Sequence, residues 1–342
     1  MSTRGPGLRR QISSWPVSTG WLLVSGFLLY LSLNLHQTLR PTLVAPAVTA
    51  WVGANAAFLL CCHWLDREAG DAIPLRMTWT RRDWLLVLSL LALAALFRFP
   101  ALGQFPVAMH NDEGALSYEA VKVLDGRIQS PFVVGWYGHP TLWAYLNAVV
   151  LAATGPTLAG ARTVAAVIGI LTVGTTYYMA RLLYARPVAI LAGVLLATYH
   201  FHIHFSRIAL NNIADPFFGT LIVSAFSLGI YTKRRLFFGL TGLLAGLALF
   251  FYMGARLFLP LLVLIGASWL LLHPAALQRW RSPRNWYPVF LVVAGLIFAA
   301  GPLLYMFLGQ PELFLIRFQI EGLTAATMTQ LMEANGWSRG QL

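Results

Sequence analysis

Long apolar runs separated by short polar segments dominate the chain. A transmembrane helix needs about 20 predominantly apolar residues, within a range of about 17 to 25. Nine runs reach or approach that length, at 20–35, 42–64, 84–97, 161–183, 188–204, 216–231, 237–252, 257–272 and 287–307. The pattern therefore predicts an all-α polytopic membrane protein with about nine transmembrane helices.

A tenth apolar run, 140–153, determines the topology. It has about 14 residues, a length more typical of an interfacial helix than of a span, and it carries the polar Asn147. If the run does not cross and the N-terminus is cytoplasmic, 15 Lys and Arg lie inside and 9 outside; if it crosses, the split is 12 and 12. Because cytoplasmic loops carry the excess of Lys and Arg, we expect nine spans with the N-terminus inside and the C-terminus outside.

This topology places a long loop, 98–160, on the outer face. We expect two interfacial helices in it. The first covers 112–125, with Asn111 as its N-cap and Gly126 after its end. The second is the short run 140–153, whose Pro140 suits the first turn of a helix.

The composition agrees with a membrane protein. The chain is 58% hydrophobic and 11% charged, whereas soluble domains carry about 25% charged residues. Its formal net charge of +12 would suggest nucleic acid in a soluble protein, but the cations flank apolar runs, so we expect no nucleic-acid partner. We interpret Arg4, Arg9 and Arg10, before the run at Trp21, as the basic end of an uncleaved signal anchor.

Acidic side chains gather on the predicted outer face. Asp112 and Glu113 begin the first interfacial helix, and Asp215 lies at the outer end of a span. A helix N-terminus favours an ionised carboxylate, which can accept a proton from a hydroxyl group. The alternative is that the pair only caps an amphipathic helix.

Three arginines lie at span ends on the same face: Arg162, Arg207 and Arg256. Guanidinium groups bind phosphate through paired hydrogen bonds, and a lipid phosphate lies at this depth; the alternative is snorkelling toward lipid head groups. The histidines at 200, 202 and 204 would point apart on a helix. We therefore favour interfacial hydrogen bonding over metal ligation for them, and we expect no required cofactor or metal.

Several short motifs, taken in order, resemble those of a known family. His-Asn-Asp-Glu-Gly at 110–114 resembles the acidic motif in the first large outer loop of polyprenyl-phosphate-sugar transferases, and Gly-His-Pro-Thr-Leu at 138–142 resembles their His-Pro-Pro-Leu element, with Thr141 replacing the second proline. The span from Arg162 and the segment 205–215 resemble the elements that follow. The ordered set, over about 97–231, resembles the protein O-mannosyltransferase-like family of GT-C fold, which includes lipid A aminoarabinose transferases.

The resemblance implies a membrane glycosyltransferase. A sugar would pass from a polyprenyl-phosphate donor to an acceptor on the outer face, with inversion at the anomeric carbon. It implies Asp112 as general base beside Glu113, and Arg162, Arg207 and His139 on the lipid phosphate. The substrate pocket would contain His110, Asn211, Asn212, Asp215 and Arg256.

The same resemblance suggests how the chain is organised. We expect one transmembrane domain, with extra N-terminal spans at 1–83, a GT-C-like core at 84–307 and an outer tail at 308–342. The protein would reside in a bacterial plasma membrane. Two alternatives are an accessory subunit of the same fold, which would bind another membrane protein, and a transporter. A transporter is disfavoured because no acidic residue lies in the middle of a span and no inverted repeat is evident.

Overall fold

A computed structural model describes residues 16–37, 41–75, 77–273 and 286–313, and the single positions 278, 282, 329 and 333. The predicted signal-anchor arginines lie outside the described residues, as do Arg279, Arg281 and Arg284 and nearly all of the predicted tail. Within these ranges the chain is helical, and no strand forms. An isolated antiparallel bridge pairs Val134 with Pro140.

Twelve α-helices and four short 3-10 helices follow one another in the described ranges. The α-helices are α1 (Val17–Gln37), α2 (Val44–Ala69), α3 (Arg81–Arg98), α4 (Asn111–Leu124), α5 (Leu142–Thr154), α6 (Leu158–Leu183), α7 (Arg186–Thr198), α8 (His200–Ser206), α9 (Ala214–Thr232), α10 (Arg235–Ala248), α11 (Phe258–Leu272) and α13 (Tyr287–Gly309). The 3-10 helices are η1 (Pro41–Leu43), η2 (Trp136–Gly138), η3 (Asn211–Ile213) and η4 (Met253–Leu257).

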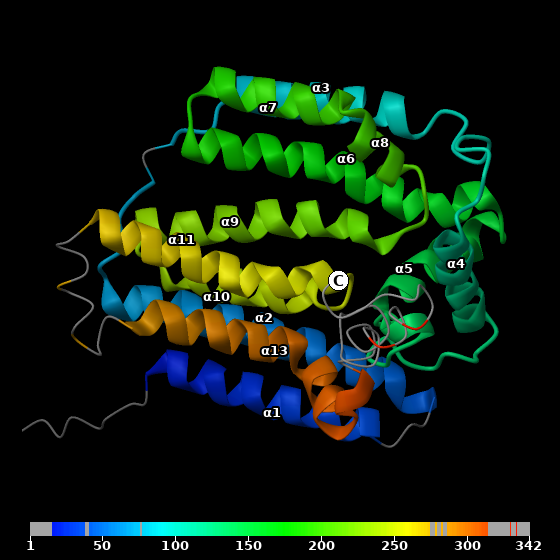
Figure 1. Cartoon of the computed structure of the whole chain (residues 1–342). Helices are drawn as coiled ribbons and strands as arrows, with labels where there is room; N and C mark the ends of the chain where they lie inside the picture. The colour runs from blue at the N-terminus through cyan, green and yellow to red at the C-terminus, as the bar shows by residue number, and fades with distance from the viewer. Residues whose placement is uncertain are drawn as a thin grey trace, which may run out of the picture.

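The long helices run side by side in one bundle, and α4 and α5 lie together at one end of it (Figure 1). From one side of the bundle to the other, α3 and α7 pack on α6, α6 packs on α9, and α9 packs on α10. Helix α10 contacts α2 and α13, and α1 packs on α2. The α4 and α5 end is where α3 finishes and α6 and α9 begin (Figure 1), so the motif-bearing loops meet there.

The predicted spans correspond in order to helices of the structure. Six described helices are long and apolar enough to cross a membrane, and the bent pair α7 and α8 makes a seventh if it forms one span. The chain is therefore an all-α integral membrane protein. Spans at α3, which carries four charged residues, and at the shorter α10 remain predictions, and so does the total of nine.

Two of the predicted spans are interrupted or end earlier in the structure. The predicted span 188–204 is broken at Tyr199, where α7 and α8 meet at a bend of 59°. Tyr199 has an extended backbone (φ −67°, ψ 113°), which no apolar pattern reveals. The predicted helix 237–252 ends at Ala248, because the backbone turns there toward η4.

Close backbone approach explains the contact between α10 and α13. A Cβ atom on Gly242 would overlap the backbone carbonyl of Val292, and one on Gly295 would overlap that of Gly239. Small residues allow such close contact between membrane helices. One turn further along α13, the indole of Trp51 in α2 donates to the Ala299 carbonyl over 2.8 Å, which ties the N-terminal hairpin to the bundle.

Candidate active site

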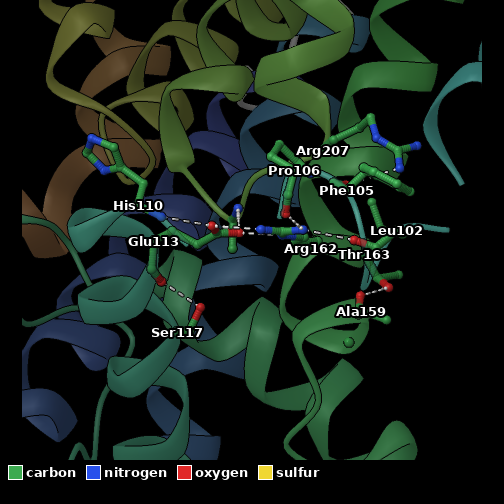
Figure 2. Close-up of polar contacts among 12 residues, drawn as sticks. Leu102, Phe105, Pro106, His110, Glu113, Ser117, Ala159, Arg162, Thr163 and Arg207 are labelled. Carbon is green, nitrogen blue, oxygen red and sulfur yellow. Dashed lines mark hydrogen bonds and ion pairs between the residues drawn. The ribbon is translucent and has the colours of Figure 1, made fainter. Parts of the chain in front are cut away.

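Glu113 and Arg162 form a buried ion pair beneath the start of α4. Arg162 Nε donates to Glu113 Oε1 over 2.6 Å, and Arg162 Nη2 donates to Oε2 over 3.1 Å. Both side chains are 0% exposed, and Figure 2 shows them pointing toward each other. Such two-point pairing fixes the orientation of both groups.

The same pair binds the backbone of three neighbouring segments. Arg162 Nη1 donates to the carbonyls of Leu102 and Pro106 over 3.1 and 3.0 Å. The carboxylate of Glu113 accepts from the amides of Ala209 and His110. We call these two side chains and their four backbone partners the Glu113–Arg162 hub; it joins α4, α6 and the loops after α3 and α8 (Figure 2).

The first helical turn of α4 is capped by His110. His110 Nδ1 accepts a hydrogen bond from the Asp112 amide over 3.1 Å, and the Glu113 carboxylate accepts one from the His110 amide, which completes a capping box. The prediction that Asn111 is the cap is wrong, because His110 has the extended backbone of a cap (φ −70°, ψ 145°) and Asn111 is already helical. The imidazole of His110 thus helps to shape the helix start.

Asp112 is the acidic side chain that this arrangement leaves available. It is partly exposed, and its carboxylate makes no hydrogen bond or ion pair with any residue in the described part of the chain. The N-terminus of α4 favours negative charge at this position. An ionised carboxylate without a protein partner is suited to accept a proton from a bound hydroxyl.

Arg207 holds the loop that follows α3. Its guanidinium donates hydrogen bonds to five backbone carbonyls, those of Phe97, Arg98, Pro100, Ala101 and Phe105. Partial burial, and then the positive charge of Arg162, hold the pKa of Arg207 below its ordinary value. Arg162 and Arg207 are therefore close enough to interact electrostatically. The guanidinium N–H groups of Arg207 that form these five hydrogen bonds are used within the protein.

His139 is held by polar and aromatic contacts. Asn211 Nδ2 lies 2.9 Å from His139 Nδ1 and donates its other hydrogen to the Phe251 carbonyl over 2.6 Å. Since Asn211 Nδ2 can only donate, the network assigns Nδ1 as an acceptor. The His139 ring stacks with Trp136 at 5.9 Å and with Tyr252 at 6.2 Å, so the predicted neighbours His139 and Asn211 are brought together.

Asp215 begins α9 beside η4. Among the described residues it has no hydrogen-bond or ion-pair partner, and a Cβ on Gly254 would collide with its carboxylate. Arg256 lies two residues further along η4. The neighbouring Asn212 has a buried Oδ1 that accepts no hydrogen bond from the described residues. The structure thus places Asp215 against the segment that carries Arg256.

Arg98 is a buried cation that the sequence reasoning treated only as an outer-loop charge. It is 0% exposed and bonds to Ser206 Oγ, His202 Nδ1 and three carbonyls. The sequence signal that could have identified Arg98 as a buried residue was its position at the end of an apolar run, before Phe-Pro.

The histidine trio lies on α8, with His202 buried and His200 and His204 exposed. Within the described ranges no three His, Cys, Asp or Glu residues gather to hold a metal.

Residues 138–305 match the model of the dolichyl-phosphate-mannose-protein mannosyltransferase family. This stretch, just under half of the chain, is similar to that family. The matched mannosyltransferase-family region includes His139, Arg162, Arg207 and Asp215, and it begins after the acidic motif at 110–114. Searches of curated proteins and of solved structures find no match.

The family match confirms the resemblance derived from the short motifs. The family's name describes a glycosyltransferase, and the apolar helices agree with a protein in a membrane. The individual site residues remain predictions. The structure adds which of them contact one another: Glu113 contacts both His110 and Arg162, and His139 contacts Asn211.

Proposed function

We propose that the protein transfers a sugar from a polyprenyl-phosphate donor to an acceptor hydroxyl at the outer face of a membrane, with Asp112 as the general base. The family supports a lipid-phosphate sugar as the donor. The observation that carries the choice of base is the unpartnered Asp112 carboxylate next to the fully paired Glu113.

In this reaction the acceptor oxygen forms a bond to the anomeric carbon, and the bond from that carbon to the phosphate oxygen breaks. The hydroxyl proton passes to the Asp112 carboxylate, and the electron pair leaves with the polyprenyl phosphate. Attack opposite the leaving group inverts the anomeric configuration. A general base in such a step contributes about 10²- to 10⁴-fold in rate.

Glu113 acts as a positioning residue in this proposal. Its carboxylate is 0% exposed and accepts from Arg162, Ala209 and His110, so it is not presented to a substrate. Its charge and geometry instead keep the start of α4, and hence Asp112, fixed against α6. Fixed positioning of a reactive group lowers the entropic cost of reaching the transition state.

Positively charged side chains near the candidate site would stabilise the negative charge that develops on the departing phosphate. Arg162 and Arg207 lie close enough to interact electrostatically, and Arg98 is a third buried cation, at the end of α3. Charges prearranged in a site of low dielectric stabilise charge that develops during the reaction. We assign His139 and Arg256 as phosphate contacts, Asn211 as the residue that orients His139, and Asn212 and Asp215 to the sugar or acceptor side of the pocket.

Proteoliposomes containing a mixed pool of polyprenyl-phosphate sugars test this proposal. Wild-type protein should release polyprenyl phosphate in the presence of acceptor, and Asp112→Asn should not. Asp125→Asn, at the other end of α4 and 52% exposed, is the matched control and should retain wild-type turnover. Correctly folded wild-type protein without turnover on any donor would contradict the transferase, and turnover of Asp112→Asn at the control rate would contradict the assigned base.

A further inference from the structure

A cavity of about 480 Å³ lies beside α4 and is separate from the Glu113–Arg162 hub. Its walls are the ends of α1 and α2, one side of α4 and the loop 127–136. We call it the outer-loop cavity. Pockets of about 300 to 1,000 Å³ hold small ligands or their head groups, so the volume suits a compact group such as one or two sugar rings.

The outer-loop cavity is amphipathic. Leu35 near the end of α1 and Val44 at the start of α2 provide aliphatic surface, and Val133 and Val134 continue it. The polar lining comes from α4 and the following loop, and includes Glu119, Lys122, Arg127, Gln129 and Ser130. Because α1 and α2 are predicted spans, the aliphatic part lies where lipid chains would meet the polar head-group region.

The charges of the lining are balanced. Lys122 Nζ lies 2.6 Å from Glu119 Oε1, and Arg127 Nη2 lies 2.7 Å from Asp125 Oδ2. Each cation therefore has a carboxylate partner, which disfavours an additional anion. Carboxylate oxygens and ammonium or guanidinium groups have further hydrogen-bonding capacity, which a ligand with several neutral hydroxyl groups can use as both donor and acceptor.

Trp136 connects the cavity with the candidate active site. It lines the cavity, and its ring stacks on His139 with an interplanar angle of 11°. The electron-rich face of an indole attracts partly positive hydrogens, such as the C–H groups of a pyranose ring. The Trp136 amide also donates to Glu119 Oε2 over 3.1 Å, so aromatic and acidic groups are fixed together.

Helix α4 gives the distance between the cavity and the proposed base. Asp112 and Glu119 are seven residues apart on one α-helix, so they lie on the same side of it. At 1.5 Å per residue the separation along the axis is about 10 Å. A head group of one or two sugars that enters the cavity beside Glu119 can therefore present a hydroxyl toward Asp112.

We propose that the outer-loop cavity binds the neutral, hydroxyl-rich head group of a membrane glycolipid, and that this lipid is the acceptor. The acceptor role rests on the proposed transferase function; the binding does not. In the transfer, a head-group hydroxyl oxygen bonds to the anomeric carbon of the donor, its proton passes to Asp112, and polyprenyl phosphate leaves.

Native mass spectrometry from nanodiscs tests the binding without any donor. The nanodiscs contain monoglucosyl diacylglycerol, phosphatidylcholine and phosphatidic acid with identical acyl chains. Wild-type protein should retain the glucosyl lipid in preference to the other two. Val44→Trp fills the aliphatic part of the cavity and should lower that retention about tenfold, or about 1.4 kcal/mol, whereas Val52→Trp, on the 54% exposed surface of the same helix, should leave it unchanged.

Gln129→Ala gives an independent check should Val44→Trp fail to fold. Gln129 is an exposed cavity residue whose side chain bonds to no described residue, and its removal should lower retention severalfold. Preferential retention of phosphatidic acid, equal retention of all three lipids, or unchanged retention in both cavity variants would overturn the proposal. Asp112→Asn should bind the glucosyl lipid normally but fail to glycosylate it. Failure of the glycolipid-binding proposal can therefore be distinguished from failure of the proposed transferase function.

Discussion

Replacing Glu113 with glutamine removes one charge from the centre of the hub. The Ala209 and His110 amides bond to different carboxylate oxygens. The single oxygen of the glutamine amide can replace only one of these acceptors, so the substitution deletes the charge opposite Arg162 and one acceptor position. Both members of the pair are 0% exposed, with donor–acceptor distances of 2.6 and 3.1 Å. Breaking a buried pair by removing one partner costs about 3–5 kcal/mol, because the other charge stays buried without compensation.

A double-mutant cycle separates this effect from general damage. Arg162→Gln should destabilise by a similar amount, and the double variant Glu113→Gln/Arg162→Gln should be less destabilised than the sum of the two single variants, because no isolated charge remains. Asp125→Asn serves as the control. It breaks the pair with Arg127, in which both side chains are about half exposed, and should leave the unfolding free energy unchanged.

Unfolding by SDS titration in mixed micelles measures these free energies. Glu113→Gln should have a lower unfolding free energy than the control. The double variant should lose less unfolding free energy than the two single variants lose together. Additive effects, or a Glu113→Gln variant as stable as Asp125→Asn, would refute the view that the ion pair organises this loop.

Three further substitutions test other parts of the structure. Gly242→Ala should destabilise the bundle by about 1–3 kcal/mol through overpacking against α13, whereas Gly26→Ala, with open space around its Cβ position, should not; thermal unfolding in detergent compares them. Arg207→Lys cannot reproduce five bonds to carbonyls, so amide hydrogen exchange of the loop after α3 should accelerate, and unchanged exchange would contradict the assigned role. Gly254→Ala should displace the Asp215 carboxylate and raise the KM for donor or acceptor with little loss of stability; unchanged kinetics would remove Asp215 from the site.

The lengths of the apolar runs predicted most of the fold, because the membrane sets the length of a spanning helix. Two helices were expected in the long loop, at 112–125 and 140–153, and helices occur there as α4 (Asn111–Leu124) and α5 (Leu142–Thr154); their interfacial position stays a prediction. Local backbone geometry was harder to predict. Hydropathy averages over many residues, whereas the bend at Tyr199 and the cap at His110 each depend on the φ and ψ of one residue.

The sequence identified the charged residues of the candidate site but not their partners. Asp112 and Glu113 are adjacent and chemically alike, yet only Glu113 pairs with Arg162. That difference arises from a contact between residues 49 positions apart, which no local pattern encodes. Arg207 likewise had the chemistry of a phosphate ligand, and the structure adds its bonds to the neighbouring loop.

The outer-loop cavity could not be inferred from sequence because its lining is discontinuous. His36 at the end of α1, Glu119 in α4 and Trp136 in η2 meet only after the N-terminal hairpin packs beside the loop. The contact of His36 Nδ1 with Ser130 Oγ over 3.2 Å illustrates that packing. Sequence periodicity reveals which residues share a helix face, but not which separate elements enclose a volume.

Steady-state turnover and donor binding of Asp112→Asn, measured side by side in proteoliposomes, test the central claim most directly. If Asp112 is the general base, kcat should fall by about 10²- to 10⁴-fold, while the affinity for polyprenyl-phosphate sugar and the unfolding free energy remain those of the wild type. Wild-type kcat in Asp112→Asn, or a loss explained entirely by weaker donor binding, would contradict the account.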